Sequence, residues 1–343
     1  MRTIAWLFLS AFLLCAQPWE RHAKPEDAGY SSARLEALRQ WLATGGTTAM
    51  MVVADGKSLF EYGDLKHLSY LASVRKSVLA ILYGKYVADG TIDLTKTLEQ
   101  IGLDDLGGLL PQEKKATIEH LITARSGVYH PASNPGDATS SAPPRGSQRP
   151  GSYFLYNNWD FNAAGAVFEK LTGRDIYDAL ETDLARPIGM EDFDRSRQKK
   201  TGDLKRSQFP AYHMWLSTRD MARIGQLMLQ EGQWQGKTVV SREWVRRIVS
   251  LITPHREMNP PAQRSLAVPT RWGYGVMWWV WDAPGAEGPF RGAYTGMGAG
   301  GQFITVLPEY KLVVAHKTDV SKSRPVSGAE YQTILHMLLT SRR

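Results

Sequence analysis

The chain has 343 residues, with 41 Lys and Arg against 34 Asp and Glu, which gives a net charge of +7 at pH 7. The positive charge is dispersed, and no basic run exceeds Lys199-Lys200 or Arg246-Arg247, so the clustered patch that nucleic-acid binding requires is not present in the sequence. The only cysteine is Cys15, so a chain of this length must rely on its apolar core rather than on disulfides.

The first sixteen residues predict a secretory signal peptide. Arg2 precedes an apolar run from Ile4 to Leu14, and Cys15-Ala16 offers a cleavage position with a small residue. The run is shorter than the roughly twenty residues of a membrane anchor, and Leu14 occupies the place where a lipoprotein signal needs a small residue, which disfavours lipidation. We therefore expect that residues 1–16 are removed and that the mature protein comprises residues 17–343. We expect it to be periplasmic or secreted and to have no stable membrane span.

Next along the chain, the apolar pattern predicts a helix over residues 35–42 and a β-hairpin over residues 50–63. Asp55-Gly56 lies in the middle of the hairpin, and Asp-Gly is a preferred dipeptide in the tight turns that join antiparallel strands.

A buried helix is predicted from Ser73 to a stop at Gly90, because apolar residues recur at helical spacing, at Val74, Val78, Ile81, Leu82 and Tyr86. Ser73 and Lys76 lie three positions apart and therefore share one face of this helix. A serine hydroxyl needs a base to act as a nucleophile, and a lysine can be that base where burial lowers its pKa. Ser73 would also lie in the first turn, whose free N–H groups stabilise a developing oxyanion.

The segment His130 to Gly151 is rich in proline, serine and glycine and is too long for a simple connection. It is either a lid or rim of a binding site or an excursion on the surface. It leads into Tyr156-Asn157-Asn158, which opens a second predicted helix that ends at Gly173.

A second proline-rich stretch, residues 253–270, precedes the aromatic run from Arg271 to Trp281. We predict this run to be a strand with aromatic side chains on both faces, mostly in the core, with one or two at the rim of an apolar pocket. A glycine-rich segment, residues 292–301, contains Tyr294-Thr295-Gly296. Further strands are predicted over residues 302–308 and 311–316, and a last helix over residues 328–339.

Several segments resemble known motifs but lack the spacing or structural context that those motifs require. Gly232–Thr238 resembles a phosphate-binding loop, but its first glycine is one residue too close to the second. Gly296–Gly301 leads into a strand, where a dinucleotide-binding fingerprint requires a helix. There is no Gly-x-Ser-x-Gly, and the histidines lack metal-ligand spacing. We therefore expect no cofactor and no metal.

Three motifs, in this order, resemble those of the serine β-lactamase and penicillin-recognising family: Ser73-x-x-Lys76, Tyr156-x-Asn158, and Tyr294-Thr295-Gly296 where β-lactamases carry Lys-Thr-Gly. Within that family the chain is similar to the branch of class C β-lactamases, D,D-peptidases, family VIII esterases and 6-aminohexanoate-oligomer hydrolases, from about residue 25 to the end.

The resemblance implies a single catalytic domain with an α+β, β-lactamase-like fold. One lobe, about residues 25–72 and 251–343, would be an antiparallel sheet flanked by helices. The other lobe, about residues 73–250, would be mainly helical, and the active site would lie in the cleft between the two lobes.

The same resemblance implies roles for individual residues. Ser73 is the acylated nucleophile, and Lys76 and Tyr156 share its proton and later pass one to the leaving group. Asn158 orients Lys76 and the substrate. The backbone N–H groups of Ser73 and Met297 form the oxyanion hole, and the substrate-binding strand comprises Tyr294, Thr295, Gly296 and Met297.

The chain departs from the family at the third motif. β-Lactamases use a lysine there to attract a carboxylate, whereas Tyr294 has no charge at neutral pH. Lys317-Thr318 does not restore the motif, because Asp319 follows it at the end of the next strand.

This departure favours carboxylic esters or small amides as substrates, so we expect a secreted or periplasmic serine hydrolase that forms an acyl-enzyme on Ser73. Two alternatives remain open. One is a β-lactamase or D,D-peptidase that acts on β-lactams or cell-wall peptides, and the other is a non-catalytic relative that binds cell-wall material or peptides.

Overall fold

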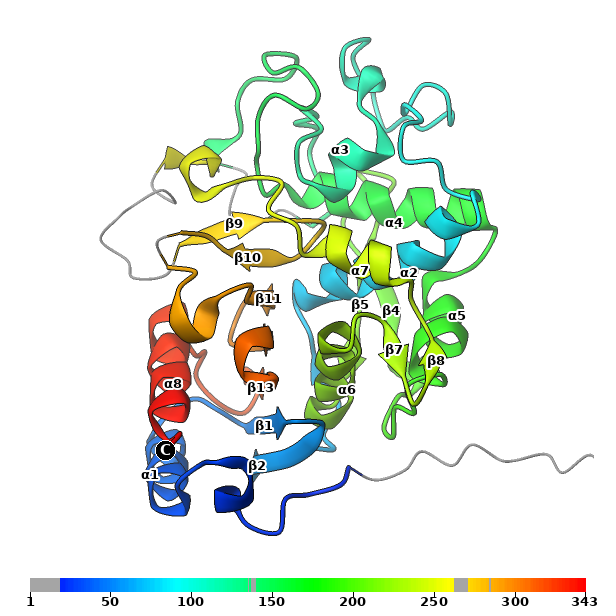
Figure 1. The fold of residues 1–343 in the computed structure, drawn as a ribbon. Coiled ribbons are helices and arrows are strands. Elements are labelled where there is room, and N and C mark those ends of the chain that lie inside the picture. The colour runs from blue at the N-terminus through cyan, green and yellow to red at the C-terminus, as the bar shows by residue number, and fades with distance from the viewer. Residues whose placement is uncertain (1–18, 135, 137–139, 262–270, 284) are drawn as a thin grey trace, which may run out of the picture.

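The computed structural model describes residues 19–134, 136, 140–261, 271–283 and 285–343 (Figure 1). The predicted signal peptide lies outside the described residues, as do residues 262–270 of the second proline-rich stretch. None of the helices in the described ranges has the length and apolar character needed to span a bilayer.

A seven-stranded antiparallel sheet joins the two ends of the chain. The N-terminal part contributes β1 (Ala49–Ala54) and β2 (Lys57–Gly63). The C-terminal part contributes the other five strands, which are β9 (Trp272–Tyr274), β10 (Trp279–Trp281), β11 (Tyr294–Gly298), β12 (Gln302–Leu307) and β13 (Leu312–Lys317). The strand order is β2-β1-β13-β12-β11-β10-β9. Every residue of β1, β12 and β13 is buried, because helices cover both faces of the sheet.

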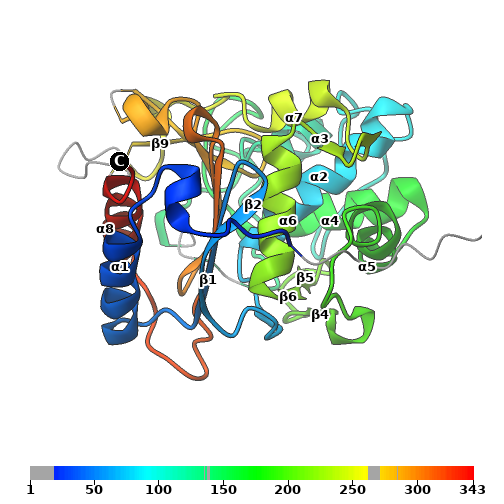
Figure 2. The same ribbon diagram turned by 60° about the horizontal axis from the view of Figure 1, so that its bottom comes forward.

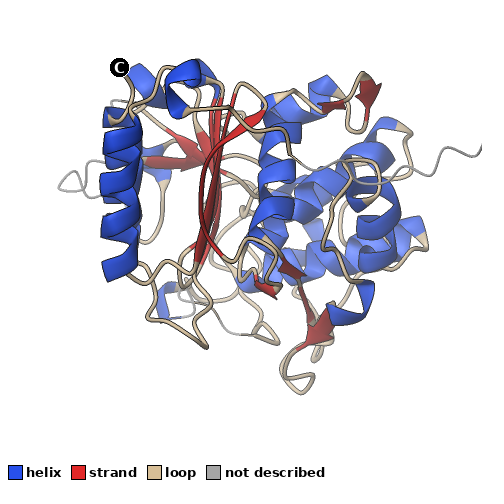
Figure 3. Cartoon of the chain, turned by 90° about the horizontal axis from the view of Figure 1, so that it is seen from below, coloured by secondary structure: helices blue, strands red, loops and turns tan. Residues whose placement is uncertain are grey.

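Two helices from opposite ends of the chain, α1 (Ser32–Thr44) and α8 (Gly328–Thr340), lie side by side on one face of the sheet. On the other face lies α6 (Thr218–Leu229), and Figure 3 shows the sheet edge-on between these two layers. A Cβ atom at Gly225 of α6 would lie 2.4 Å from Cγ1 of Val313, so only glycine permits this approach of helix to sheet.

One hydrophobic core lies between the sheet and the α1–α8 pair. The remaining helices surround a second, larger core on the α6 side of the sheet. They are α2 (Val74–Ala88), α3 (Ile118–Ile122), α4 (Asn158–Thr172), α5 (Ile176–Ala179), its π-helical continuation Leu180–Ala185, and α7 (Arg242–Ile248). Three short strand pairs lie among them: β3 (Ser69–Tyr70) with β6 (Trp215–Leu216), β4 (Lys199–Thr201) with β5 (Ala211–His213), and β7 (Gln233–Trp234) with β8 (Lys237–Thr238).

The expected α+β fold, with its antiparallel sheet and flanking helices, is confirmed. The hairpin turns at Asp55 and Gly56, which both have positive φ, and α2 ends just before Gly90. The predicted helical lobe, residues 73–250, includes α6. Because α6 packs directly on the sheet, this lobe is not separated from the sheet.

The prediction of one strand over residues 271–281 is wrong, because this run is the antiparallel hairpin of β9 and β10. The chain reverses between them, where the Gly275 N–H donates to the carbonyl of Trp278 at 2.9 Å and Met277 has a φ of 55°. A Cβ atom at Gly275 would lie 2.2 Å from the carbonyl oxygen of Ile248, so the tight contact with the end of α7 requires glycine at this point.

A buried lysine, Lys317, ties the large sheet to the strand that precedes Ser73. Its side chain is 1% exposed, and its Nζ donates to the carbonyl oxygens of Ser69 in β3 and Leu216 in β6, both at 2.7 Å. Burial lowers the pKa of Lys317 to about 7, although Asp319 opposes the shift. The lysine that does not serve as the third motif therefore holds the segment that leads into Ser73.

This lysine makes the stability of the protein depend on pH. Because folding lowers its pKa, the unfolded chain binds more protons between pH 7 and 10, and the contribution of Lys317 to stability rises with pH in that range. We expect the difference in unfolding free energy between wild type and Lys317→Met to grow by on the order of 2 kcal/mol from pH 6 to pH 9, measured by denaturant titration. Lys311→Met, at an exposed lysine, controls for the loss of a surface charge. A difference that is the same at both pH values would contradict the assignment.

Candidate active site

Ser73 occupies the N-cap position of α2, directly after a strained turn. Ala72 has a φ of 48°, a left-handed conformation that costs a non-glycine residue roughly 1 kcal/mol. The Ser73 side chain makes no capping hydrogen bond to α2, unlike the serines that begin α1 and α6. The turn thus presents the hydroxyl at the helix tip, where it is available to other groups.

Lys76 is the centre of the predicted constellation. Its side chain is 1% exposed, and its Nζ donates three hydrogen bonds: to Ser73 Oγ at 3.1 Å, to Tyr156 Oη at 2.9 Å and to Asn158 Oδ1 at 2.8 Å. The amine also lies over the rings of Tyr156 and Phe161, 4.1 and 4.4 Å from their centres. The structure therefore brings together the four polar residues of the first two motifs.

The start of α4 positions Tyr156 and Asn158. Asn157 caps this helix, because its Oδ1 accepts from the Trp159 N–H at 3.1 Å, and its Nδ2 donates to the Val128 carbonyl at 2.8 Å. Asn158 Nδ2 donates to the Asn134 carbonyl at 3.0 Å, which directs its oxygen toward Lys76. The Tyr-x-Asn spacing thus places two side chains on one side of a capped helix end.

The proline-rich loop contributes to the site through its first residues. Asn134 Oδ1 accepts from Asn162 Nδ2 at 2.7 Å, and a Cβ atom at Gly136 would lie 2.6 Å from Asn158 Nδ2. The loop therefore forms one wall beside Asn158. Residues 135 and 137–139 lie outside the described residues, and the role of the loop as a lid remains a prediction.

The second half of β11 is an open strand edge that faces the tip of α2. β10 pairs only with Tyr294 and Thr295, so the segment Gly296–Gly298 is paired with β12 on one side alone. A Cβ atom at Gly298 would lie 2.5 Å from the Leu71 carbonyl oxygen and 3.1 Å from the nitrogen of Ser73. Glycine thus lets the strand approach the nucleophile closely, and among the described residues the Ser73 N–H meets no acceptor.

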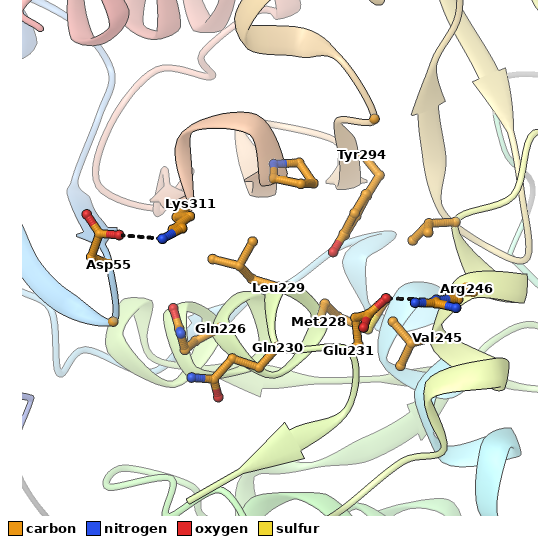
Figure 4. A pocket seen from close by; sticks show the side chains of 14 residues that line it. Asp55, Gln226, Met228, Leu229, Gln230, Glu231, Val245, Arg246, Tyr294 and Lys311 are labelled. Atoms are coloured by element: carbon orange, nitrogen blue, oxygen red, sulfur yellow. Dashed lines mark hydrogen bonds and ion pairs between the residues drawn. The ribbon is translucent and has the colours of Figure 1, made fainter.

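Two of the four residues of the predicted substrate-binding strand direct their side chains elsewhere. Thr295 is fully buried, and its Oγ1 lies 2.9 Å from Oγ1 of Thr305, on the side of α8. The Tyr294 ring is buried edge-on against Trp278, and its hydroxyl lines a separate cavity (Figure 4). Gly296 and the half-exposed Met297 lie on the open strand edge, as predicted for a strand that presents its backbone.

Aromatic rings that the sequence analysis did not assign to the site surround Tyr156. Trp279 lies 5.3 Å from it between ring centres and is partly exposed, while Phe161 and Tyr274 lie behind it at 4.8 and 5.9 Å. The sequence carried a signal for Phe161, which follows Asn158 by one helical turn. Trp279 belongs to the aromatic run expected to supply a ring at the rim. Within the described ranges, no group of three His, Cys, Asp or Glu residues is placed to hold a metal ion.

The family model described as Beta-lactamase matches residues 38–333 of the chain. The 6-aminohexanoate-dimer hydrolase of Paenarthrobacter ureafaciens is 26% identical over 310 residues, which covers 82% of this chain and 75% of that protein. Monacolin J acid methylbutanoyltransferase of Aspergillus terreus is 28% identical over 167 residues, so the chain spans only 40% of the length of this relative.

Among solved structures, a Bacillus anthracis protein described as a 6-aminohexanoate-dimer hydrolase superposes with a TM-score of 0.68 at 20% identity, covering 94% of this chain and 87% of that one. A family VIII carboxylesterase superposes with a TM-score of 0.65 at 12% identity, covering 94% and 99%. At these identities the likeness shows the fold alone.

Proposed function

Because the chain belongs to the Beta-lactamase family, we propose that it is a serine hydrolase that forms an acyl-enzyme on Ser73 from carboxylic esters or small amides. The observation that carries the proposal is the position of Lys76 Nζ, 3.1 Å from the Ser73 hydroxyl and 2.9 Å from the Tyr156 hydroxyl. These contacts give the serine proton a path to two acceptors.

The proposed reaction consists of acylation of Ser73 followed by hydrolysis of the acyl-enzyme. Ser73 Oγ attacks the carbonyl carbon, and its proton passes to the pair formed by Lys76 and Tyr156. The bond to the leaving oxygen or nitrogen breaks as the pair returns that proton to it, which leaves the acyl group on Ser73. Water then attacks the ester carbonyl, gives a proton to the same pair, and Ser73 recovers a proton as the acid departs.

The oxyanion of both tetrahedral intermediates would be held by the N–H groups of Ser73 and Met297. Support comes from the approach of Gly298 to the Ser73 nitrogen and from the open strand edge that includes Met297. Donors fixed on a helix tip and a strand need no reorganisation as charge develops, and each such donor typically contributes about 3 kcal/mol to catalysis.

The surroundings of Tyr156 favour an uncharged substrate. The position that carries the family's lysine holds the neutral Tyr294, whose side chain lies in another cavity, and the rim next to Tyr156 is formed by the ring of Trp279. An apolar rim suits an acyl or aryl group, because burying such a group gains about 25 cal/mol per Å². The relative named as a 6-aminohexanoate-dimer hydrolase, which this chain matches over 82% of its length, supports a hydrolase that acts on small molecules.

Replacing the nucleophile tests the proposal directly. Ser73→Ala should abolish covalent labelling by a fluorophosphonate and lower ester turnover by at least about a thousandfold, with the fold intact by circular dichroism. Ser77→Ala is the matched control, because this serine lies one turn further along α2 with its hydroxyl bonded to the Met277 carbonyl. It should keep the label, at a cost of about 1 kcal/mol in stability. Labelling that persists in Ser73→Ala would place the nucleophile elsewhere.

The second candidate, a β-lactamase or D,D-peptidase, is favoured by the family match itself. The two candidate functions can be distinguished by comparing kcat/KM for a short-chain p-nitrophenyl ester with kcat/KM for a chromogenic cephalosporin. We expect the ester to be preferred by roughly a hundredfold or more, since the anionic lactam lacks its usual cation. Preference for the cephalosporin would reverse the assignment of substrate class.

We also propose that the protein is exported and that its mature form begins at Gln17. The support is the apolar run of residues 4–14, flanked by Arg2 and Ala16. Expression of the full chain in a bacterial host should yield a periplasmic protein whose intact mass corresponds to residues 17–343. Leu9→Arg, which places a charge in the run, should retain residues 1–16. A wild-type product that keeps Met1 would refute the proposal.

A further inference from the structure

A cavity of about 660 Å³ lies on the same face of β11 as the Ser73 group but at the opposite end of the strand, between α6, α7 and the turns at Asp55-Gly56 and Pro308–Lys311 (Figure 4). None of Ser73, Lys76, Tyr156 and Asn158 lines it. Its volume falls within the range of small-molecule sites in proteins.

Two buried polar side chains in this cavity have no partner among the described residues. Gln226 of α6 is 4% exposed, and its side-chain amide forms no hydrogen bond. Tyr294 is also 4% exposed, and its ring reaches into the cavity with a hydroxyl that is likewise unbonded. Buried polar groups are almost always hydrogen-bonded, so the unbonded side-chain oxygen of Gln226 indicates a missing partner, and the Tyr294 hydroxyl offers a second polar group on the same cavity.

The rest of the lining limits what that partner can be. Leu229, Val249 and Pro308 supply apolar surface. The charged residues are already paired at opposite sides of the cavity, Lys311 with Asp55 at 3.7 Å and Arg246 with Glu231 at 2.8 Å. An ion would have to break one of these pairs, whereas an uncharged molecule would not.

Tyr294 connects this cavity to the reaction centre by two routes. It is the first residue of β11, and three residues further lies Met297 on the open strand edge. Its ring also packs at 5.6 Å on Trp278, whose Nε1 donates to the carbonyl of Ser77, one turn of α2 beyond Ser73. A molecule that bonds the Tyr294 hydroxyl therefore contacts β11 directly and is linked to α2 through Trp278, and these two elements carry the N–H groups proposed for the oxyanion hole.

We propose that this cavity is a second binding site, for a small uncharged molecule with an apolar body and both a hydrogen-bond donor and an acceptor, and that its occupancy changes the acylation rate of Ser73. The binding part stands on the geometry of the cavity alone, and the effect on rate rests on the proposed function.

Benzamide is a suitable probe, because it is uncharged and presents a ring, a donor and an acceptor. Its binding is measured by calorimetry or ligand-observed NMR on protein whose Ser73 has been blocked with a fluorophosphonate, so that binding at the nucleophile is excluded. We expect saturable binding that is at least tenfold weaker for benzoate, since its charge would be left unpaired in the cavity. Absence of benzamide binding up to its solubility, or equal binding of benzoate, would overturn the proposal.

Gln226→Leu is the decisive variant, because it removes the amide at nearly constant volume. It should weaken benzamide binding roughly tenfold while raising the melting temperature, since an unbonded buried amide is lost. Leu229→Trp should block binding by filling the cavity, and Leu204→Trp, at a 58% exposed leucine, is the matched control. Binding that is equal in Gln226→Leu and wild type would place the probe elsewhere.

The effect of benzamide on the acylation of Ser73 is measured in unblocked protein, as the rate at which a fluorophosphonate labels Ser73. Saturating benzamide should change this rate at least twofold in wild type and leave it unchanged in Leu229→Trp. An equal rate with and without benzamide would overturn the coupling. Failure of the proposed function is distinct, because Ser73 would then take no label at all while benzamide binding to the unlabelled protein could still be measured.

Discussion

The arrangement of the site depends on one buried amine. Lys76 Nζ reaches its own helix at Ser73, and it reaches Tyr156 and Asn158, which lie about eighty positions further along the chain. All three acceptors are side-chain oxygens. Because a buried cation is costly to leave unsatisfied, this coordination fixes the spacing of α2 and α4 and orients both hydroxyl groups. The same contacts that stabilise the lysine therefore define the reaction centre.

The seven-stranded sheet contributes the strand β11, which carries the third motif, to the site around Lys76. β11 approaches the tip of α2 through Gly296 and Gly298, where side chains would collide with Ser77 and with the backbone before Ser73. Lys317 fixes the other side of the same segment by bonding the carbonyls of Ser69 and Leu216. The segment before Ser73 is thus held between the glycines of a strand edge and a buried lysine from the neighbouring part of the sheet.

The sequence predicted what depends on local spacing. Ser73 and Lys76 share one face of α2 however that helix packs, and the cap of α4 determines the positions of Tyr156 and Asn158. These four residues could therefore be predicted from the sequence. The direction of Tyr294 could not, because it depends on how β11 lies against Trp278 and α6. The hairpin of β9 and β10 was missed, because the run of aromatic and apolar residues outweighed the turn signal of Gly273 and Gly275, and the need for glycine at 275 comes from its contact with the end of α7. Lys317 was set aside as a failed motif, because burial of a lysine by distant carbonyls leaves no local pattern.

The positive φ of Ala72 has a consequence for the rigidity of the nucleophile. Glycine would adopt this conformation without steric cost, but it would also let the turn populate other conformations and carry the Ser73 hydroxyl with it. Alanine has fewer alternatives, so once the neighbouring contacts impose the left-handed geometry the backbone has little freedom to leave it. A small loss of stability at one residue thus narrows the range of positions that a reactive oxygen can sample, which is an example of the trade-off between stability and activity in proteins.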